Sequence, residues 1–259
     1  MSRHCVKFYG ACLVVLWMVG AAAAASYDDA LLAYNKGDFP TALRQFRSLA
    51  ERGDTRSQDA LGRMYARGEG VPKDRNEAEK WFKMSSEQSD AFMSYNHGDF
   101  ETALRVYRPL AEKGQVLAQY ILGLMYANGH GVPESYPEGL KWLTKAAEQG
   151  EAKAQFSVGV IYFKGLGMAK NYAEAFKWYK RAADQGNATA QYNLGAMYAK
   201  GQTVPQDLVT AHMLYTLAAA QGVRAAGAAK EQLAKSMSAE QIAQANKMAK
   251  DWKPKPEVE

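Results

Sequence analysis

The chain has 259 residues, of which 47% are hydrophobic, and its formal net charge at pH 7 is +5. The hydrophobic share is ordinary for a folded protein and excludes a disordered chain, and the mild basic excess, interspersed with acidic residues, does not indicate a nucleic-acid-binding protein. Alanine, leucine, lysine, glutamate and glutamine are plentiful and proline is scarce. This composition favours helices, because straight-chain residues lose little rotamer freedom there.

The first 25 residues have the pattern of a secretory signal peptide. Arg3 and Lys7 lie within the first seven residues, an apolar run follows over 8–20, and five alanines precede Ser26. A basic start, a short apolar core and small residues before the cleavage point predict a removable leader, with cleavage expected after Ala25 and Ala24 as the alternative. A retained membrane anchor is the less favoured alternative, because the apolar run is shorter than the roughly 20 residues that span a bilayer.

Both cysteines, Cys5 and Cys12, lie inside this predicted leader. After cleavage the chain would contain no cysteine, so neither disulfides nor thiol chemistry would be available to it. From the predicted signal peptide we expect a periplasmic or secreted protein that does not remain inserted in a membrane once the signal has been removed.

Two short helical hairpins are predicted at 27–53 and 90–114, and each turns tightly at a Gly-Asp-Phe sequence. A longer helical hairpin follows each of them, at 54–89 and 115–150. Residues 29–89 and 90–150 therefore align without gaps and agree at about half of their positions, which indicates tandem duplication of a two-hairpin unit.

The long hairpins at 115–150, 151–186 and 187–222 repeat every 36 residues, and the copy at 54–89 matches them in register. Within 115–150, Ala118, Leu122 and Tyr126 are four residues apart and line one helical face. Gly123 has no side chain and would let the second helix approach closely, and Gly129 is placed to end the first helix in the left-handed conformation. In 54–89, Ser85, Ser86 and Ser89 replace two alanines and a glycine, so we expect its second helix to end less cleanly.

Beyond Gly222 the repeat pattern stops, and we expect two capping helices within 223–252 and a tail over 253–259. Ser238 to Gln241 reads as a capping box that opens the second capping helix. The whole prediction is a signal peptide at 1–25, a repeat region at 26–222 and these two closing segments. The hairpins of the repeat region are expected at about 27–53, 54–89, 90–114, 115–150, 151–186 and 187–222.

The recurring strings Ala-Gln-x-x-Leu-Gly-x-x-Tyr, Gly-x-Gly-Val-Pro and Ala-Ala-x-Gln-Gly resemble the Sel1-like repeat family, which is related to the tetratricopeptide repeats. The match is strongest in 152–186, and the resemblance extends over nearly all of 27–252. It implies an all-α, right-handed α-solenoid in which the first helices line a concave, partner-binding face. Members act as protein adaptors, often in envelope assembly, signalling or host contact. A branch that binds cell-wall fragments or β-lactams carries disulfides, which this chain would lack.

No catalytic constellation stands out from the repeat pattern, so we expect a protein without enzymatic activity, cofactor or metal. Outside the predicted leader the histidines are His97, His130 and His212. His97 and His130 fall in turns and are expected to be solvated, and none has metal-ligand spacing. The Gly-x-Gly loops follow helices and lack the lysine of a phosphate-binding loop. The alternative function is binding or hydrolysis of cell-wall fragments or β-lactams.

Two rows of first-helix positions are candidates for partner binding. Aromatic residues follow the Ala-Gln pair in three copies, with Asp59 at that position in the copy at 54–89. Four residues further along lie Arg63 and aliphatic residues. By analogy with tetratricopeptide repeats these rows would face the groove, where aromatic and aliphatic anchors bind extended segments or helices. The alternative, slightly favoured, is that they fill the seam between repeats. The candidate residues are Asp59, Arg63, Tyr120, Leu124, Phe156, Val160 and Tyr192.

The function predicted from these features is that of a scaffold or adaptor of the bacterial cell envelope. It would bind a protein segment in its groove and so regulate or assemble an envelope or signalling complex, for instance through the periplasmic part of a membrane sensor.

Overall fold

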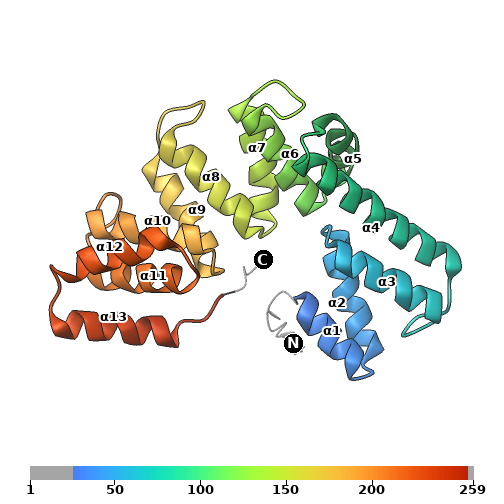
Figure 1. The fold of residues 1–259 in the computed structure, drawn as a ribbon, viewed down its shortest axis with the longest axis horizontal. Coiled ribbons are helices and arrows are strands. Elements are labelled where there is room, and N and C mark those ends of the chain that lie inside the picture. Colours follow the sequence, from blue (N-terminus) through green and yellow to red (C-terminus); the bar gives the residue numbers. More distant parts are fainter. Residues whose placement is uncertain (1–25, 256–259) are drawn as a thin grey trace, which may run out of the picture.

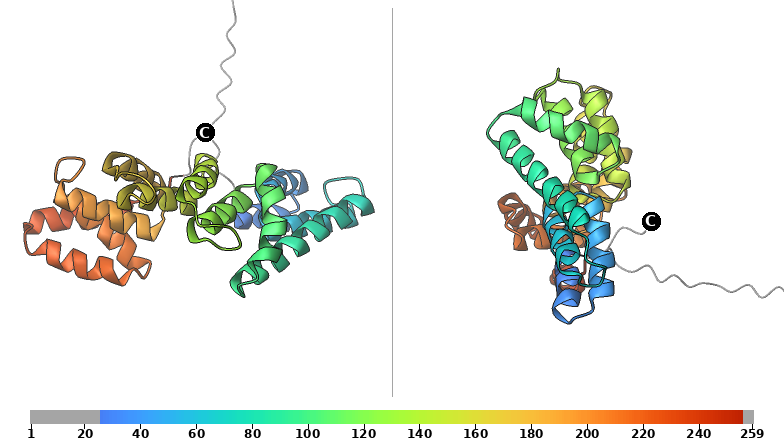
Figure 2. Two further views of the ribbon diagram at one scale, coloured as in Figure 1. Left: turned by 90° about the horizontal axis from the view of Figure 1, so that it is seen from above. Right: turned by 90° about the vertical axis from the view of Figure 1, so that its right-hand side faces the viewer.

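The computed structural model describes residues 26–255 of the chain. The predicted signal segment and residues 256–259 lie outside the described residues. The described part contains thirteen helices and no strand, and the helices form antiparallel hairpins that follow one another along a curved row (Figures 1 and 2). The helices are α1 (Tyr27–Asn35), α2 (Phe39–Glu51), α3 (Thr55–Arg67), α4 (Arg75–Asn96), α5 (Phe100–Glu112), α6 (Val116–Asn128), α7 (Tyr136–Glu148), α8 (Ala152–Lys164), α9 (Tyr172–Asp184), α10 (Ala188–Lys200), α11 (Leu208–Ala220), α12 (Arg224–Ala234) and α13 (Ala239–Asp251).

Each long repeat is built from signals at the ends of its helices. The first helices α3, α6, α8 and α10 all have 13 residues and end at a glycine in the left-handed conformation. Gly129, for example, has φ 68° and ends α6 as the sequence predicts. The second helices begin at a side chain that accepts a backbone N–H, as Asn171 does at α9. Satisfying these otherwise unpaired groups sets the helix lengths.

Glycines in the first helices allow the second helices to approach closely, as predicted. A Cβ atom at Gly123 would lie 2.9 Å from the backbone nitrogen of Leu143, and one at Gly159 would lie 2.6 Å from the ring of Tyr179. Only glycine fits at these two contacts, because real Cβ atoms essentially never come this close to another heavy atom.

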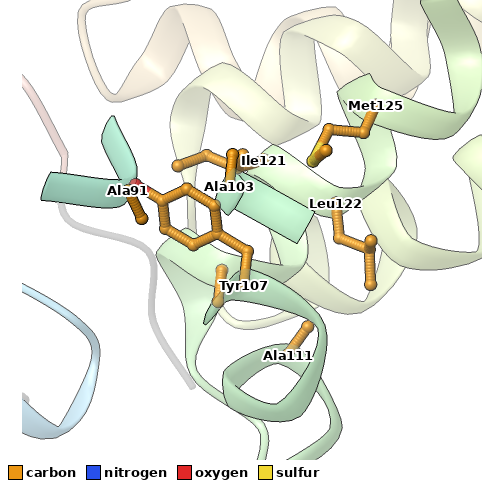
Figure 3. Close-up of a cluster of buried hydrophobic side chains, with 8 residues drawn as sticks. Ala91, Ala103, Tyr107, Ala111, Ile121, Leu122 and Met125 are labelled. Atoms are coloured by element: carbon orange, nitrogen blue, oxygen red, sulfur yellow. The ribbon is translucent and has the colours of Figure 1, made fainter. Parts of the chain in front are cut away.

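The core is a series of apolar clusters, each shared by consecutive hairpins. The cluster in Figure 3 contains Ala91 of α4, Tyr107 of α5 and Leu122 of α6, all at most 1% exposed. The next cluster joins Leu143 of α7 to Val158 of α8. Because every hairpin packs on its neighbours, the clusters form an extended core, as expected for a solenoid.

A row of buried glutamines connects the hairpins as well. Gln119 donates its side-chain amide to the carbonyl of Ala111 on α5 and accepts from Gln149 at the end of α7. The pairs Gln185–Gln155 and Gln221–Gln191 repeat this arrangement at 2.9 and 3.0 Å. The buried amides are thus satisfied by other repeat residues, as buried polar groups require.

The second helix of the copy at 54–89 differs from the expected pattern. α4 runs without a break from Arg75 to Asn96, so the expected boundary between residues 89 and 90 lies inside a helix (Figure 1). At this position the other long repeats have Gly150, Gly186 and Gly222, with φ between 88° and 94°. Ser89 carries a side chain that disfavours this conformation, and the helix continues through it.

The first hairpin and the C-terminal tail both contact hairpins in the middle of the row. Arg52, at the end of α2, accepts a hydrogen bond from the backbone nitrogen of Leu117 and donates to the carbonyl of Gln149. At the other end α12 and α13 pack on α11, and the capping box at Ser238 is present as predicted. The tail then turns back, and the backbone nitrogen of Lys255 donates to the carbonyl of Asp184 at 2.8 Å.

Candidate partner-binding face

The seven candidate residues all lie on first helices, two each on α3, α6 and α8 and one on α10. They occupy equivalent positions along these helices, so the solenoid brings them into two neighbouring rows. The rows differ between the two halves of the molecule.

In the C-terminal half the row is half-buried between repeats. Tyr120 packs against the core clusters on both sides of its hairpin, and burial together with the negative charge of Glu151 raises the pKa of its hydroxyl. The ring of Phe156 stacks on Tyr179, with the ring centres 5.8 Å apart. Tyr192 packs against Tyr215 at 5.7 Å. These aromatic residues therefore contribute to packing between helices.

The aliphatic members of the same half are also half-buried. Leu124 packs against the cluster that contains Leu143, and Val160 packs against the cluster that contains Tyr179. Both side chains keep part of their surface exposed, so neither row is completely enclosed.

In the N-terminal half the same positions are open and charged. Asp59 and Arg63 form an ion pair at 2.5 Å, with 41% and 51% of their side chains exposed. Exposed ion pairs contribute little to stability, about 0–1 kcal/mol. The pair therefore presents two charged groups at the surface where the later repeats have apolar ones.

The short hairpins add two members that the sequence comparison of long repeats missed. Leu32 of α1 and Met93 of α4 stand two residues before Tyr34 and Tyr95, as Arg63 stands two residues before Tyr65. Both side chains are 54% exposed. The spacing to the tyrosine was the available signal, but the Leu-Gly motif that marks this position in the long repeats is absent. We call Leu32, Arg63 and Met93, together with Asp59 of the neighbouring row, the open row.

The histidines differ from one another in their surroundings. His97 is exposed, as predicted. His130 lies in a loop as predicted, but it is half-buried rather than solvated, because its ring stacks on Phe100 at 4.2 Å and its Nδ1 lies 3.1 Å from the hydroxyl of Tyr95. His212 is 3% exposed, and burial, with the positive charge of Lys230, lowers its pKa.

Within residues 26–255 no group of three or more His, Cys, Asp or Glu side chains is placed to hold a metal ion. None of the helices over this range is long and apolar enough to cross a membrane.

Stacked antiparallel hairpins with an extended core and a face of equivalent first-helix positions define the α-solenoid class of repeat proteins. The Sel1 repeat model matches residues 55–90, 116–151, 152–187 and 188–223, and the chain belongs to the Sel1 repeat family. The predicted all-α solenoid is thereby confirmed. Sel1 repeats form a protein-interaction fold, and the family typically consists of non-catalytic scaffolds.

Known relatives are similar over different parts of the chain. An exopolysaccharide production negative regulator of Rhizobium leguminosarum bv. viciae is 32% identical over an alignment of 139 residues, and the match covers 44% of this chain. The match spans 52%, about half, of that relative's length. A Sel1 repeat protein from Oxalobacter formigenes is 28% identical with a TM-score of 0.53, over 88% of this chain and all of the other. The protective antigen c5321 of uropathogenic Escherichia coli is 25% identical with a TM-score of 0.44, over 88% and 61%.

Proposed function

We propose that the protein is a non-enzymatic scaffold of the bacterial cell envelope that binds a partner protein along its first-helix face. The single observation that supports this most directly is the open row. Leu32 and Met93 expose more than half of their surface on a face where the equivalent residues of later repeats are half-buried. Exposed large apolar side chains beside charged groups are a common composition for a protein-binding surface.

The envelope location rests on the N-terminal sequence, where a basic start, an apolar run and five alanines precede Ser26. A regulatory role is supported by the relative whose name is exopolysaccharide production negative regulator. We infer that this chain also regulates or assembles an envelope or signalling complex, for instance by binding the periplasmic part of a membrane sensor. The absence of cysteines after position 12 suits a solenoid held together by packing and hydrogen bonds without disulfides.

Site-specific crosslinking in living cells tests the proposal. A photoreactive residue is introduced singly at positions 32, 63 and 93 of the open row, and at 120, 156 and 192 of the half-buried row. Lys177, whose side chain is 67% exposed on the second helix α9, provides the control position. The captured proteins are identified by mass spectrometry.

The expected result is one envelope protein captured from the open-row positions and not from position 177. Only self-crosslinks, or the same proteins from position 177 as from the open row, would overturn the binding face. Turnover of muropeptides or a β-lactam by the purified protein, abolished by one substitution, would overturn the non-enzymatic assignment.

A further inference from the structure

One glutamine pair of the repeat is broken in this structure. Gln58 and Gln88 have the register of the pairs Gln119–Gln149, Gln155–Gln185 and Gln191–Gln221, each separated by 30 residues. Gln58 still donates to the carbonyl of Ala50. Its side-chain oxygen, however, and both polar side-chain atoms of Gln88 are buried without a hydrogen-bond partner in the described part. Gln58 is completely buried and Gln88 is 2% exposed.

The broken pair coincides with the unbroken course of α4. In the other long repeats the donating glutamine is the residue at which the second helix ends, as Gln149, Gln185 and Gln221 do. A left-handed glycine then turns the chain into the next hairpin. Gln88 instead lies inside a helix that continues through Ser89. Buried amides without partners are rare in proteins. This junction leaves polar atoms of Gln58 and Gln88 unpaired, so its hydrogen bonding is less complete than that of its three equivalents.

The same straight course leaves apolar surface uncovered. In the long repeats the next first helix packs back on the preceding second helix, as α8 does on α7 and α10 on α9. Residues 90–96 have no such contact with residues 75–87, because both belong to one continuous helix. Phe92 and Met93 are 51% and 54% exposed as a result. Leu31 and Leu32, their equivalents on α1, are also exposed, and α1 is the first helix of the described chain.

We propose that residues 85–93 form a joint, and that α4 exchanges between the straight helix and a form broken at Ser89. In the broken form Gln88 ends the helix and donates to Gln58, and residues 90–96 fold back on 75–87 and cover Phe92 and Met93. The straight form leaves amides unpaired, whereas the broken form places a serine in the left-handed conformation, which is unfavourable for it. These opposing costs balance the two forms, and the joint controls whether Met93 is available in the open row.

A distance measurement between spin labels tests the joint. The labels are attached through Arg75→Cys, at the exposed start of α4, and Lys141→Cys on α7, in a full chain that also carries Cys5→Ser and Cys12→Ser. Ser89→Gly removes the conformational cost of the broken form. We expect it to increase the ratio of broken to straight molecules by about tenfold. Ser89→Ala is expected to leave only the straight form populated.

Ser86→Gly is the matched control, because it places a glycine one turn away in the same helix at another exposed serine. It weakens the helix equally but does not lie at the position of the turn. The rate of Met93 oxidation by hydrogen peroxide gives a second readout, expected to fall in Ser89→Gly and not in Ser86→Gly. Identical distance distributions for the two glycine variants would overturn the proposal.

If Ser89→Gly fails to fold, a glutamine replacement still decides the question. Gln88→Leu removes an unpaired amide and the donor of the broken form, so it is expected to raise the melting temperature and eliminate the broken population. Gln149→Leu removes a paired amide and is expected to lower the melting temperature. Equal losses in the two variants would show that Gln88 is paired as completely as Gln149, and would contradict an exchange with a straight form in which its amide has no partner.

Discussion

The side-chain amide of Gln149 donates to the side-chain oxygen of Gln119 across 2.7 Å, at the base of one helical hairpin. Gln119 in turn donates to the carbonyl of Ala111 on the preceding helix at 3.2 Å. One buried side chain therefore links three consecutive helices, α5, α6 and α7. Since this linkage recurs in the next two hairpins, polar bonds and apolar packing together set how successive repeats stack.

Replacing the central glutamine is expected to be costly. Gln119→Leu keeps the side-chain volume but leaves the amide of Gln149 without its principal acceptor and the Ala111 carbonyl without its donor. Leaving buried groups unsatisfied costs about 1–3 kcal/mol. We expect the free energy of unfolding in urea to fall by an amount in this range.

The exposed residue Gln244 on α13 supplies the control for this substitution. Gln244→Leu changes the same groups at the surface and is expected to alter stability by less than about 0.5 kcal/mol. An equal effect of the two substitutions would mean that the buried hydrogen bonds do not hold the hairpins together.

The glycines of the first helices are expected to be intolerant of even a methyl group. In Gly159→Ala the new Cβ would lie 2.6 Å from the ring of Tyr179, so α8 and α9 must separate. Overpacking of this kind costs about 1–3 kcal/mol. We expect a lower melting temperature, with helical content retained in the circular dichroism spectrum.

Gly227→Ala is the matched change with the opposite expected sign. A Cβ at Gly227 in α12 has no atom within 4 Å, so the substitution only improves helix propensity, by about 1 kcal/mol. If both alanine variants were destabilised alike, the close approach at Gly159 would not explain the glycine in the repeat.

The repeat register could be predicted from the sequence because it depends on local signals. Left-handed glycines such as Gly129 and close-approach glycines such as Gly123 each act within one hairpin, and both are confirmed. The unbroken course of α4 could not be predicted, although Ser89 was a visible departure. A helix that ends at Ser89 and a helix that continues through Ser89 differ in free energy by only the small cost of one left-handed residue. The short hairpin that follows also has its own helical pattern.

The environment of the candidate rows depends on how the solenoid curves, which no single residue type specifies. Phe156 has the same chemistry whether it lines a groove or fills a seam, and its stacking on Tyr179 is set by the packing of two helices. The contact of Lys255 with Asp184 was likewise beyond prediction, because it joins segments about 70 residues apart without any periodic pattern.

Alanine substitutions of a half-buried residue and of an open-row residue should separate the contribution to packing from the contribution to binding. Phe156→Ala removes a half-buried ring that packs against Tyr179, and we expect a loss of about 2–4 kcal/mol in the free energy of unfolding, close to the range for buried aromatic truncations. Met93→Ala removes an exposed side chain and is expected to change stability by less than about 1 kcal/mol. Urea unfolding monitored by circular dichroism measures both.

Crosslinking of the partner measures the effect of Met93→Ala on binding. Met93→Ala is expected to reduce crosslinking of the partner from position 32, whereas a stable protein with undiminished crosslinking would remove Met93 from the binding face. If Phe156→Ala left stability unchanged, the C-terminal row would be open groove surface rather than seam.

The burial of His212 predicts a loss of stability in mild acid. Burial and the neighbouring positive charge of Lys230 lower the pKa of this histidine in the folded protein, and its Nδ1 has no partner within the described residues. The unfolded chain therefore binds a proton more readily than the folded one. The contribution of His212 to stability is present above the unfolded pKa of about 6.5 and is lost as the pH falls through the lower, folded value.

We expect urea unfolding midpoints to fall between pH 7.5 and 5.5, and the fall to be smaller in His212→Leu. His97→Gln serves as the control because that side chain is exposed. An unchanged pH dependence in His212→Leu would show that the folded protein admits the charged imidazole at this position.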